Sequence, residues 1–333
     1  MSHTLLRVND LSVQYKTDDS LVEALSGVSF SLEKGETLGL VGETGAGKTT
    51  IAKSIMGLVP NPPGQIVGGE IFYNDEDLLK FSQAEMRHVR GARISMIFQD
   101  PMTALDPVMT VGKQIAEVVS IHQKCTSAQA MKKAREMLET VGISEKRADD
   151  YPNQFSGGMK QRVVIAIALA CNPSLLIADE PTTALDVTIQ AQVLDLMRNL
   201  RKELNTSLLL ITHDLGVVAQ ICTNVAILYA GEIIEYGSVR QIFHDYAHPY
   251  TEGLFGSIPM LNKDEIRLTP IEGIMPDPTD LPLGCKFHPR CKYRTENCGQ
   301  VNPPLIDIGQ GHLARCVKGR ENKKTQDKKG GYL

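Results

Sequence analysis

Alternating hydrophobic and polar residues mark the first forty positions of the chain. Residues 11–15 and 28–32 place apolar side chains at every second position, which is the period of a strand with one buried face. A further apolar run, residues 37–41, leads directly into a glycine-rich loop. We therefore predict antiparallel strands across residues 5–40, with residues 37–41 as the last of them.

Helical periodicity follows the glycine-rich loop. Residues 49–58 predict a helix that ends before Pro60. Residues 102–150 are rich in helix-favouring side chains, and Thr126 or Ser127 is placed to cap a helix that runs to about residue 140. This second segment predicts a helical subdomain.

Uninterrupted apolar runs return after the helical region. Such runs are typical of strands that are buried on both faces. They occupy residues 175–179, 207–211 and 224–228, and a helical pattern over residues 188–204 separates the first from the second. Strands that alternate with helices predict a parallel sheet covered on both sides.

The composition changes beyond residue 240. The stretch from there to the end holds nine of the 17 prolines and four of the seven cysteines. We predict a large domain at residues 1–240 and a small loop-rich extension at residues 241–333. The final residues, 318–333, carry many lysines and no apolar period, and they predict a solvated tail.

Charge and hydropathy narrow the class of protein. A net charge of −4 and a pI of about 6.1 argue against a chain whose main affinity is for nucleic-acid phosphates. No segment approaches the ~20 apolar residues that span a bilayer. The first residues lack the pattern of a secretion signal. We predict a protein that stays in the cytoplasm and binds no nucleic acid.

A candidate phosphate-binding loop lies at residues 42–49, which read Gly-Glu-Thr-Gly-Ala-Gly-Lys-Thr and fit the pattern G-x-x-x-x-G-K-[ST] between a predicted strand and a predicted helix. Small residues let backbone N–H groups surround a phosphate, and the helix presents its positive end to it. Lys48 would reach the β- and γ-phosphates of ATP, and Thr49 would bind Mg²⁺. The nucleotide contacts predicted here are Gly42, Gly45, Ala46, Gly47, Lys48, Thr49 and Thr50.

Two adjacent carboxylates, Asp179 and Glu180, end the apolar run at residues 175–179. Beside a phosphate loop, Asp179 can hold Mg²⁺ through water and Glu180 can polarise an attacking water molecule. A strand that ends in Asp-Glu is by itself more often a solvated edge. The phosphate loop upstream is what makes a catalytic interpretation the better one.

Residues 155–162, Phe-Ser-Gly-Gly-Met-Lys-Gln-Arg, resemble the signature loop of the ATPase domain of ABC transporters. In that family the loop acts on a nucleotide held by a partner subunit. The resemblance implies that Ser156, Gly157 and Gly158 contact the γ-phosphate of that nucleotide. Met159 stands where Gln is commoner, which raises the hypothesis that the two composite sites of an ATPase pair differ.

Other elements of the same family occur in the expected order. By resemblance, Gln99 senses Mg²⁺ and the permease, Asp186 crosses the dimer interface, and His213 contacts the γ-phosphate and orders Glu180. Tyr15 stands where the family stacks an aromatic ring on adenine, although only its position supports this. Taken singly, each of these residues is more often a packing or solvated residue.

The resemblance covers residues 5–240 and implies an α/β fold of the P-loop ABC ATPase type. Such a fold has a RecA-like parallel sheet core, an antiparallel β subdomain and a helical subdomain. Here it would be followed by the small, loop-rich cysteine extension.

Four cysteines gather in the extension, at Cys285, Cys291, Cys298 and Cys316. Four thiolates suffice for a Zn²⁺ site or an iron–sulfur cluster. Structural zinc favours pairs separated by two to four residues, and the wider spacing here favours a cluster. Zinc and four unrelated thiols remain the alternatives.

The extension also resembles the C-terminal region of ATPase subunits from bacterial dipeptide and oligopeptide importers, through His-Pro-Tyr-Thr at residues 248–251 and through Gly284-Cys285-x5-Cys291. Some members of that family hold a [4Fe–4S] cluster there. The Phe-Ser-Gly-Gly-Met form resembles the D-type paralogue, whose partner is a homologous F-type ATPase. The resemblance thus implies a nucleotide-sandwich heterodimer at the cytoplasmic face of the membrane, two permease subunits and an extracytoplasmic peptide-binding protein.

Other functions stay open on these residues. A related importer of nickel or another small solute would share the same motifs. A soluble ABC ATPase that acts on ribosomes, DNA ends or cluster assembly is disfavoured by the single nucleotide cassette and by a segment between Thr49 and Ser156 too short for a long coiled coil. An exporter ATPase is disfavoured by the extension, and a P-loop kinase by the lack of an acceptor-site pattern.

Overall fold

The computed structural model describes residues 4–17, 19–183, 185–257 and 270–316, and it contains two sheets. The smaller sheet is antiparallel, with strand order β2-β1-β4-β5. Its strands are β1 (Thr4–Lys16), β2 (Leu21–Glu33), β4 (Gly64–Tyr73) and β5 (Glu76–Asp77). The prediction of antiparallel strands near the start of the chain is confirmed for β1 and β2.

The larger sheet has eight strands in the order β11-β12-β10-β9-β3-β8-β7-β6. Strands β3, β6, β7, β8 and β9 are parallel, and β10 to β12 continue the sheet in antiparallel fashion. The bounds are β3 (Thr37–Val41), β6 (Ile94–Ile97), β7 (Leu175–Asp179), β8 (Ser207–Thr212), β9 (Asn224–Tyr229), β10 (Glu232–Ser238), β11 (Ile306–Gly309) and β12 (His312–Ala314).

The prediction for residues 37–41 was wrong in one respect. They form β3, which is a central parallel strand between β8 and β9 and not the last strand of the antiparallel group. All five of its residues are buried, as a strand covered on both faces requires. Its unbroken burial is the feature that separates it from the half-buried β1 and β2.

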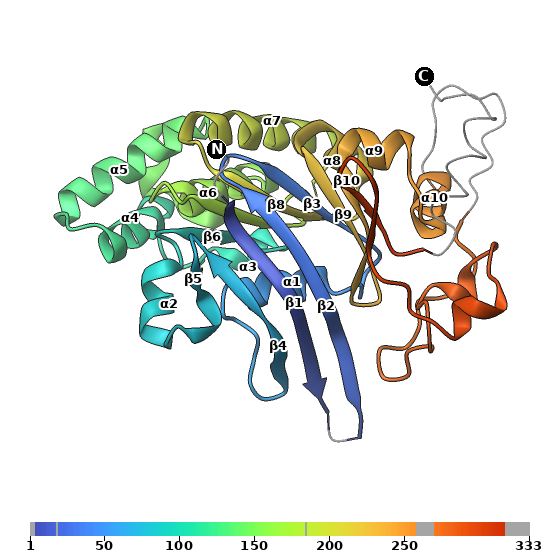
Figure 1. Ribbon diagram of the computed structural model, residues 1–333. Helices are drawn as coiled ribbons and strands as arrows, with labels where there is room; N and C mark the ends of the chain where they lie inside the picture. Colours follow the sequence, from blue (N-terminus) through green and yellow to red (C-terminus); the bar gives the residue numbers. More distant parts are fainter. Residues whose placement is uncertain (1–3, 18, 184, 258–269, 317–333) are drawn as a thin grey trace, which may run out of the picture.

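Helices and the small sheet cover the two faces of the large sheet. In β7 and β8, Leu176, Ala178, Leu208 and Leu210 pack into one core, which also holds residues of α6 and α7. The side chains between them, such as Ile177 and Ile211, pack into a second core with the small sheet and α1. Figure 1 shows α7 along one face of the sheet and β1, β2 and β4 along the other. The predicted covered parallel sheet is confirmed.

The helices confirm most sequence-based boundaries within a few residues. The segment 102–150 forms a helical subdomain, and Thr126 caps α5 through a capping box with Gln129. The helices are α1 (Lys48–Ile55), α2 (Gln83–Val89), α3 (Pro101–Ala104), α4 (Val111–His122), α5 (Ser127–Thr140), α6 (Gly157–Leu169), α7 (Val187–Leu204), α8 (Leu215–Ile221), α9 (Val239–His244) and α10 (Pro249–Gly256). Short 3-10 turns occupy Leu78–Lys80, Glu145–Asp149, Pro152–Gln154, His288–Arg290 and Glu296–Gly299.

Residues 306–314 of the extension form part of the large sheet. The β11–β12 hairpin pairs with β10, so the extension supplies the last two strands of the sheet. Figure 1 shows the extension, in orange and red, at the end of the molecule away from α4 and α5. Among the described residues, no helix is long and apolar enough to cross a membrane.

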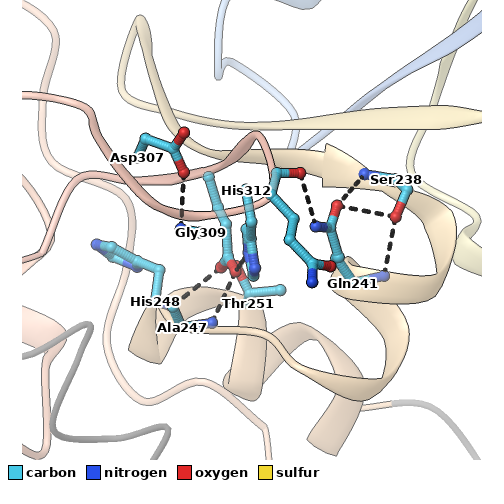
Figure 2. Close-up of polar contacts among 10 residues, drawn as sticks. Ser238, Gln241, Ala247, His248, Thr251, Asp307, Gly309 and His312 are labelled. Carbon is cyan, nitrogen blue, oxygen red and sulfur yellow. Dashed lines mark hydrogen bonds and ion pairs between the residues drawn. The ribbon is translucent and has the colours of Figure 1, made fainter.

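A buried carboxylate fastens the extension to β10. Glu235 accepts hydrogen bonds from the backbone N–H groups of Ala247 (2.6 Å) and His248 (2.9 Å), from the Thr251 hydroxyl (2.6 Å) and from the His312 ring (2.7 Å). Figure 2 shows these partners, which come from the start of α10 and from β12. The Glu235 and His312 side chains are fully buried. One side chain thus joins two segments that are far apart in the sequence.

Removing this carboxylate should loosen the extension. Glu235→Ala leaves four buried donors without an acceptor, and each such group costs about 1–3 kcal/mol. We expect a clear fall in the melting temperature and faster hydrogen exchange at residues 247–251. Glu203→Ala on the exposed face of α7 should change neither measurement. Unchanged exchange at residues 247–251 would show that other contacts hold α10 in place.

Candidate functional site

The phosphate loop connects the end of β3 to the start of α1. Gly47 has φ 103°, a left-handed conformation, and a Cβ there would lie 2.6 Å from the Leu25 side chain. A Cβ on Gly42 would lie 2.4 Å from the carbonyl oxygen of Leu228. Glycine is therefore required at both positions for the backbone to follow this path. Ala46 is buried, and its carbonyl accepts the N–H of Gly231 at 3.1 Å.

Lys48 is buried at the first position of α1 and bends back over the loop. Its Nζ donates to the carbonyl oxygens of Gly42 (2.7 Å) and Glu43 (3.0 Å). Burial lowers the pKa of Lys48 from its ordinary value, while the charges of Glu180, Asp179 and Glu43 oppose that shift. The ammonium group is thus held by weak neutral acceptors, which the charged phosphate oxygens of a nucleotide can replace.

A pair of oxygen ligands suited to Mg²⁺ lies beside Lys48. The side chain of Thr49 hydrogen-bonds to Asp179, which ends β7. Burial raises the pKa of Asp179, and the Thr49 hydrogen bond opposes the rise. Hydroxyl and carboxylate oxygens are ligands that Mg²⁺ prefers. Thr49 and Asp179, two of the three residues predicted to contact Mg²⁺ along with Gln99, are therefore neighbours.

Three side chains converge on the carboxylate of Glu180. Gln99 Nε2 donates at 3.1 Å, Thr183 Oγ1 donates at 3.0 Å, and His213 Nδ1 lies 3.2 Å away. Burial alone would raise the pKa of Glu180, but the hydrogen bonds from His213 and Thr183 outweigh it and lower the pKa. The carboxylate is therefore ionised near neutral pH, as an acceptor that polarises a water molecule must be.

The backbone at Glu180 adopts a conformation that is rare for a side chain of its type. Its φ is 47°, in the left-handed region. Residues held in that region cluster at functional sites, where surrounding contacts maintain the strain. Gln99, Glu180 and His213 are residues that the sequence predicts for this site. Thr183 is not, because its only sequence signal is its place three residues after Glu180.

The signature loop lies elsewhere on the surface and packs against α7. Ser156 caps α6, and its hydroxyl accepts the N–H of Met159 at 3.4 Å. A Cβ on Gly158 would lie 2.4 Å from Ile189, so α6 and α7 could not pack this closely with any other residue. Ser156 and Gly157 are exposed. An exposed helix N-terminus of this kind is suited to an anion.

The remaining predicted residues occupy separate places. Asp186 caps α7, with its carboxylate accepting the N–H of Ile189 at 3.0 Å, and it is exposed next to Val187. The ring of Tyr15, near the end of β1, packs closely on Gly64. Thr50 is half-buried in α1. The adenine and interface roles of Tyr15 and Asp186 stay predictions.

The four cysteines of the extension surround one cavity. Cys285, Cys291, Cys298 and Cys316 all line it, together with Phe287 and His248. None of the four forms a disulfide. Within the described part of the chain, no group of three or more His, Cys, Asp or Glu side chains is arranged to hold a metal ion. The thiols share a site, but they do not converge on one point.

The extension also touches the phosphate loop, which sequence analysis did not predict. Arg290 forms an ion pair with Glu43 at 3.1 Å, and the Tyr250 hydroxyl accepts the N–H of Glu43 at 3.0 Å. The two partners of Glu43 follow it by more than 200 residues in the sequence. No local pattern could have paired them.

Comparison with protein families gives two matches along the chain. Residues 25–183 match the model described as ABC transporter, and residues 234–298 match the model described as oligopeptide/dipeptide transporter, C-terminal region. The first span includes the phosphate loop and Glu180, and the second includes three of the four cysteines of the extension.

Similarity to known proteins extends over almost the whole chain. The oligopeptide transport ATP-binding protein OppD of Bacillus subtilis is 52% identical over 314 residues, which are 93% of this chain and 88% of that protein. The dipeptide transport ATP-binding protein DppD of the same organism is 49% identical, over 94% of each chain.

Solved structures resemble the part of the chain that carries the nucleotide motifs. The dimeric, post-hydrolysis ATP-binding cassette MJ0796 bound to ADP and Pi is 27% identical, with a TM-score of 0.64, and the match covers 71% of this chain and 99% of that one. A second is cbiO1 from Clostridium perfringens, part of the ABC transporter complex cbiONQ, at 28% identity and a TM-score of 0.63, with 72% and 90% covered.

Glu180→Gln should separate nucleotide binding from hydrolysis. The amide keeps the size of the side chain but loses the charge that polarises water, and loss of a general base typically costs about 10²–10⁴-fold in rate. We expect ATP binding within about threefold of wild type and almost no steady turnover. Glu203→Gln on the surface of α7 is the matched control. Near-normal turnover in Glu180→Gln would remove Glu180 from the catalytic role.

Proposed function

This chain belongs to the family of ABC transporter ATP-binding proteins with an oligopeptide/dipeptide transporter C-terminal region, and we propose that it is the ATP-hydrolysing subunit of a peptide importer. The observation that carries the proposal is the joint match of a cassette and an importer-type extension in one chain. Relatives named for oligopeptide and dipeptide transport support the same solute class.

The contacts around Glu180 support its proposed role in hydrolysis. Lys48 would bind the β- and γ-phosphates after leaving its two carbonyl partners, and Glu180 would take a proton from the attacking water. Gln99, Thr183 and His213 fix the Glu180 carboxylate in position. Mg²⁺, when bound by Thr49 and Asp179, would neutralise phosphate charge.

A second ATPase subunit is needed to complete each site. Ser156 and Gly157 lie exposed at the start of α6, where they are open to contact from a second subunit. Dimeric cassettes among the similar solved structures support a nucleotide-sandwich arrangement. We propose that the partner is the homologous F-type subunit, with two permease subunits and a peptide-binding protein completing the importer. The complex would sit at the cytoplasmic face of the membrane, with this chain peripheral to it.

We propose that the four cysteines hold an iron–sulfur cluster, with a single zinc ion as the alternative. Zinc needs all four sulfurs about 2.3 Å from one point, and the thiols around the cavity are not arranged in that way. A [4Fe–4S] cluster takes one cysteine per iron, so its ligands need only surround a common space. Four thiols that line one cavity meet this weaker requirement. We propose that the cluster, when bound, joins the loops of the extension.

Metal analysis of protein purified without oxygen tests this assignment. We expect iron and acid-labile sulfide in equal amounts and a broad visible absorption, all reduced in Cys291→Ser and retained in Cys125→Ser, whose cysteine lies outside the cavity. One zinc per chain without sulfide would favour the zinc alternative. Absence of both would make the four cysteines unrelated thiols.

Transport by the whole assembly tests the function. In vesicles carrying both ATPases and both permeases, with the binding protein, we expect ATP-driven uptake of a labelled dipeptide or a longer peptide. Lys48→Ala should abolish it because the β- and γ-phosphates lose their cation. Nickel uptake without peptide uptake would favour the alternative importer. ATP hydrolysis by a chain that never associates with the permeases would favour a soluble ATPase.

A further inference from the structure

Arg290 lies between the cysteine cavity and the phosphate loop. Its side chain is only 7% exposed. The Nη1 group lies 3.1 and 3.2 Å from the two carboxylate oxygens of Glu43 and 3.4 Å from the Tyr229 hydroxyl, while Nε donates to the carbonyl of Glu272 at 3.0 Å. The next residue, Cys291, lines the cavity. The guanidinium group is therefore fixed by several partners.

Aromatic packing keeps this contact in place. Tyr229, Tyr250 and Phe287 pack on one another, with ring centroids 4.7–5.4 Å apart. Tyr250 also accepts the N–H of Glu43, so the extension holds both the backbone and the carboxylate of that residue. Although burial acts against it, hydrogen bonds to Tyr229 and Glu43 raise the pKa of Arg290. Arg290 is thus a permanent cation next to the loop.

The negative charge of the Glu43 carboxylate would weaken nucleotide binding if it were not neutralised. It belongs to the loop that must receive the negatively charged phosphates, and its charge already acts on Lys48. A carboxylate free to move would repel the phosphates and compete with them for the Lys48 ammonium group. Holding it on Arg290 neutralises its charge and directs it toward the extension.

We propose that Arg290 is a positioning residue for ATP binding, which holds the Glu43 carboxylate away from the phosphate site and leaves Lys48 available to the nucleotide. The inference rests on the proposed ATPase function. It assigns part of the nucleotide site to the importer-type extension. The simpler alternative is that Arg290 only anchors the extension to the cassette.

ATP titration of the purified full-length chain distinguishes a positioning role of Arg290 from a purely anchoring role. Arg290→Ala should raise the dissociation constant for ATP about tenfold, which corresponds to about 1.4 kcal/mol. The double variant Glu43→Gln with Arg290→Ala should bind within about threefold of wild type, because the unneutralised carboxylate is gone. Glu43→Gln alone should also bind almost normally. If Arg290 only anchored the extension, adding Glu43→Gln to Arg290→Ala would not restore ATP affinity.

Arg315→Ala is the matched control. Arg315 fastens the same extension by donating to the carbonyls of Ile233 (3.2 Å) and Pro303 (3.1 Å), and these contacts do not involve the phosphate loop. We expect it to change ATP affinity by less than about twofold. Arg290→Lys keeps the charge but loses the planar fork, and it should bind with intermediate affinity. Thermal melting of each variant checks that it is folded.

Turnover of the assembled complex gives a second measurement. The repulsion acts on bound ATP and on the transition state alike, so Arg290→Ala should raise KM for ATP about tenfold and change kcat by less than about twofold. Normal ATP affinity in Arg290→Ala, equal losses in Arg290→Ala and Arg315→Ala, or failure of Glu43→Gln to restore binding would each overturn the inference. A wild-type chain that does not bind ATP would instead refute the proposed function, and the inference with it.

Discussion

The register of three parallel strands is the constraint on which the candidate site depends. In the order β3-β8-β7, Val41 pairs with Thr212 and Ile211 pairs with Asp179. The phosphate loop, His213 and Glu180 each follow directly from the end of one of these strands. Because the strands are parallel and end at the same level, three loops from distant parts of the sequence meet at one edge. A shift in pairing would separate Lys48 from Glu180.

Buried polar contacts join the extension to the cassette, and they take the place of hydrogen bonds to water. Glu235 satisfies four donors from α10 and β12 inside the protein. Burial lowers the pKa of His248 to about 4, so its neutral ring can accept the Tyr250 N–H at the start of α10. These contacts set the position of Tyr250 and therefore of its hydroxyl on Glu43. The stability of the C-terminal hairpin and the shape of the phosphate loop are thus linked by packing.

The residues predicted to contact nucleotide lie in two separate parts of the chain. Lys48, Asp179 and Glu180 lie at the edge of the parallel sheet, whereas Ser156 starts a helix of the helical subdomain. Asp186 and Val187 are exposed at the start of α7. In the proposed dimer Ser156 would contact the nucleotide of the partner and Asp186 would cross the interface, which would explain why these polar helix caps remain at the surface.

The sequence by itself determined the elements whose chemistry is local. The glycine loop, the Asp179–Glu180 pair and the signature-like segment at residues 155–162 follow from residue types at fixed spacing, and uninterrupted apolar runs predicted the parallel strands after residue 170. Tertiary structure alone decided that β3 is a central strand, that Thr183 joins the Glu180 cluster, and that Arg290 meets Glu43. The physical reason is the distance in sequence over which each interaction acts. Hydrogen-bonding and steric preferences act between near neighbours in sequence, while pairing across the sheet and across 247 residues depends on how the whole chain packs.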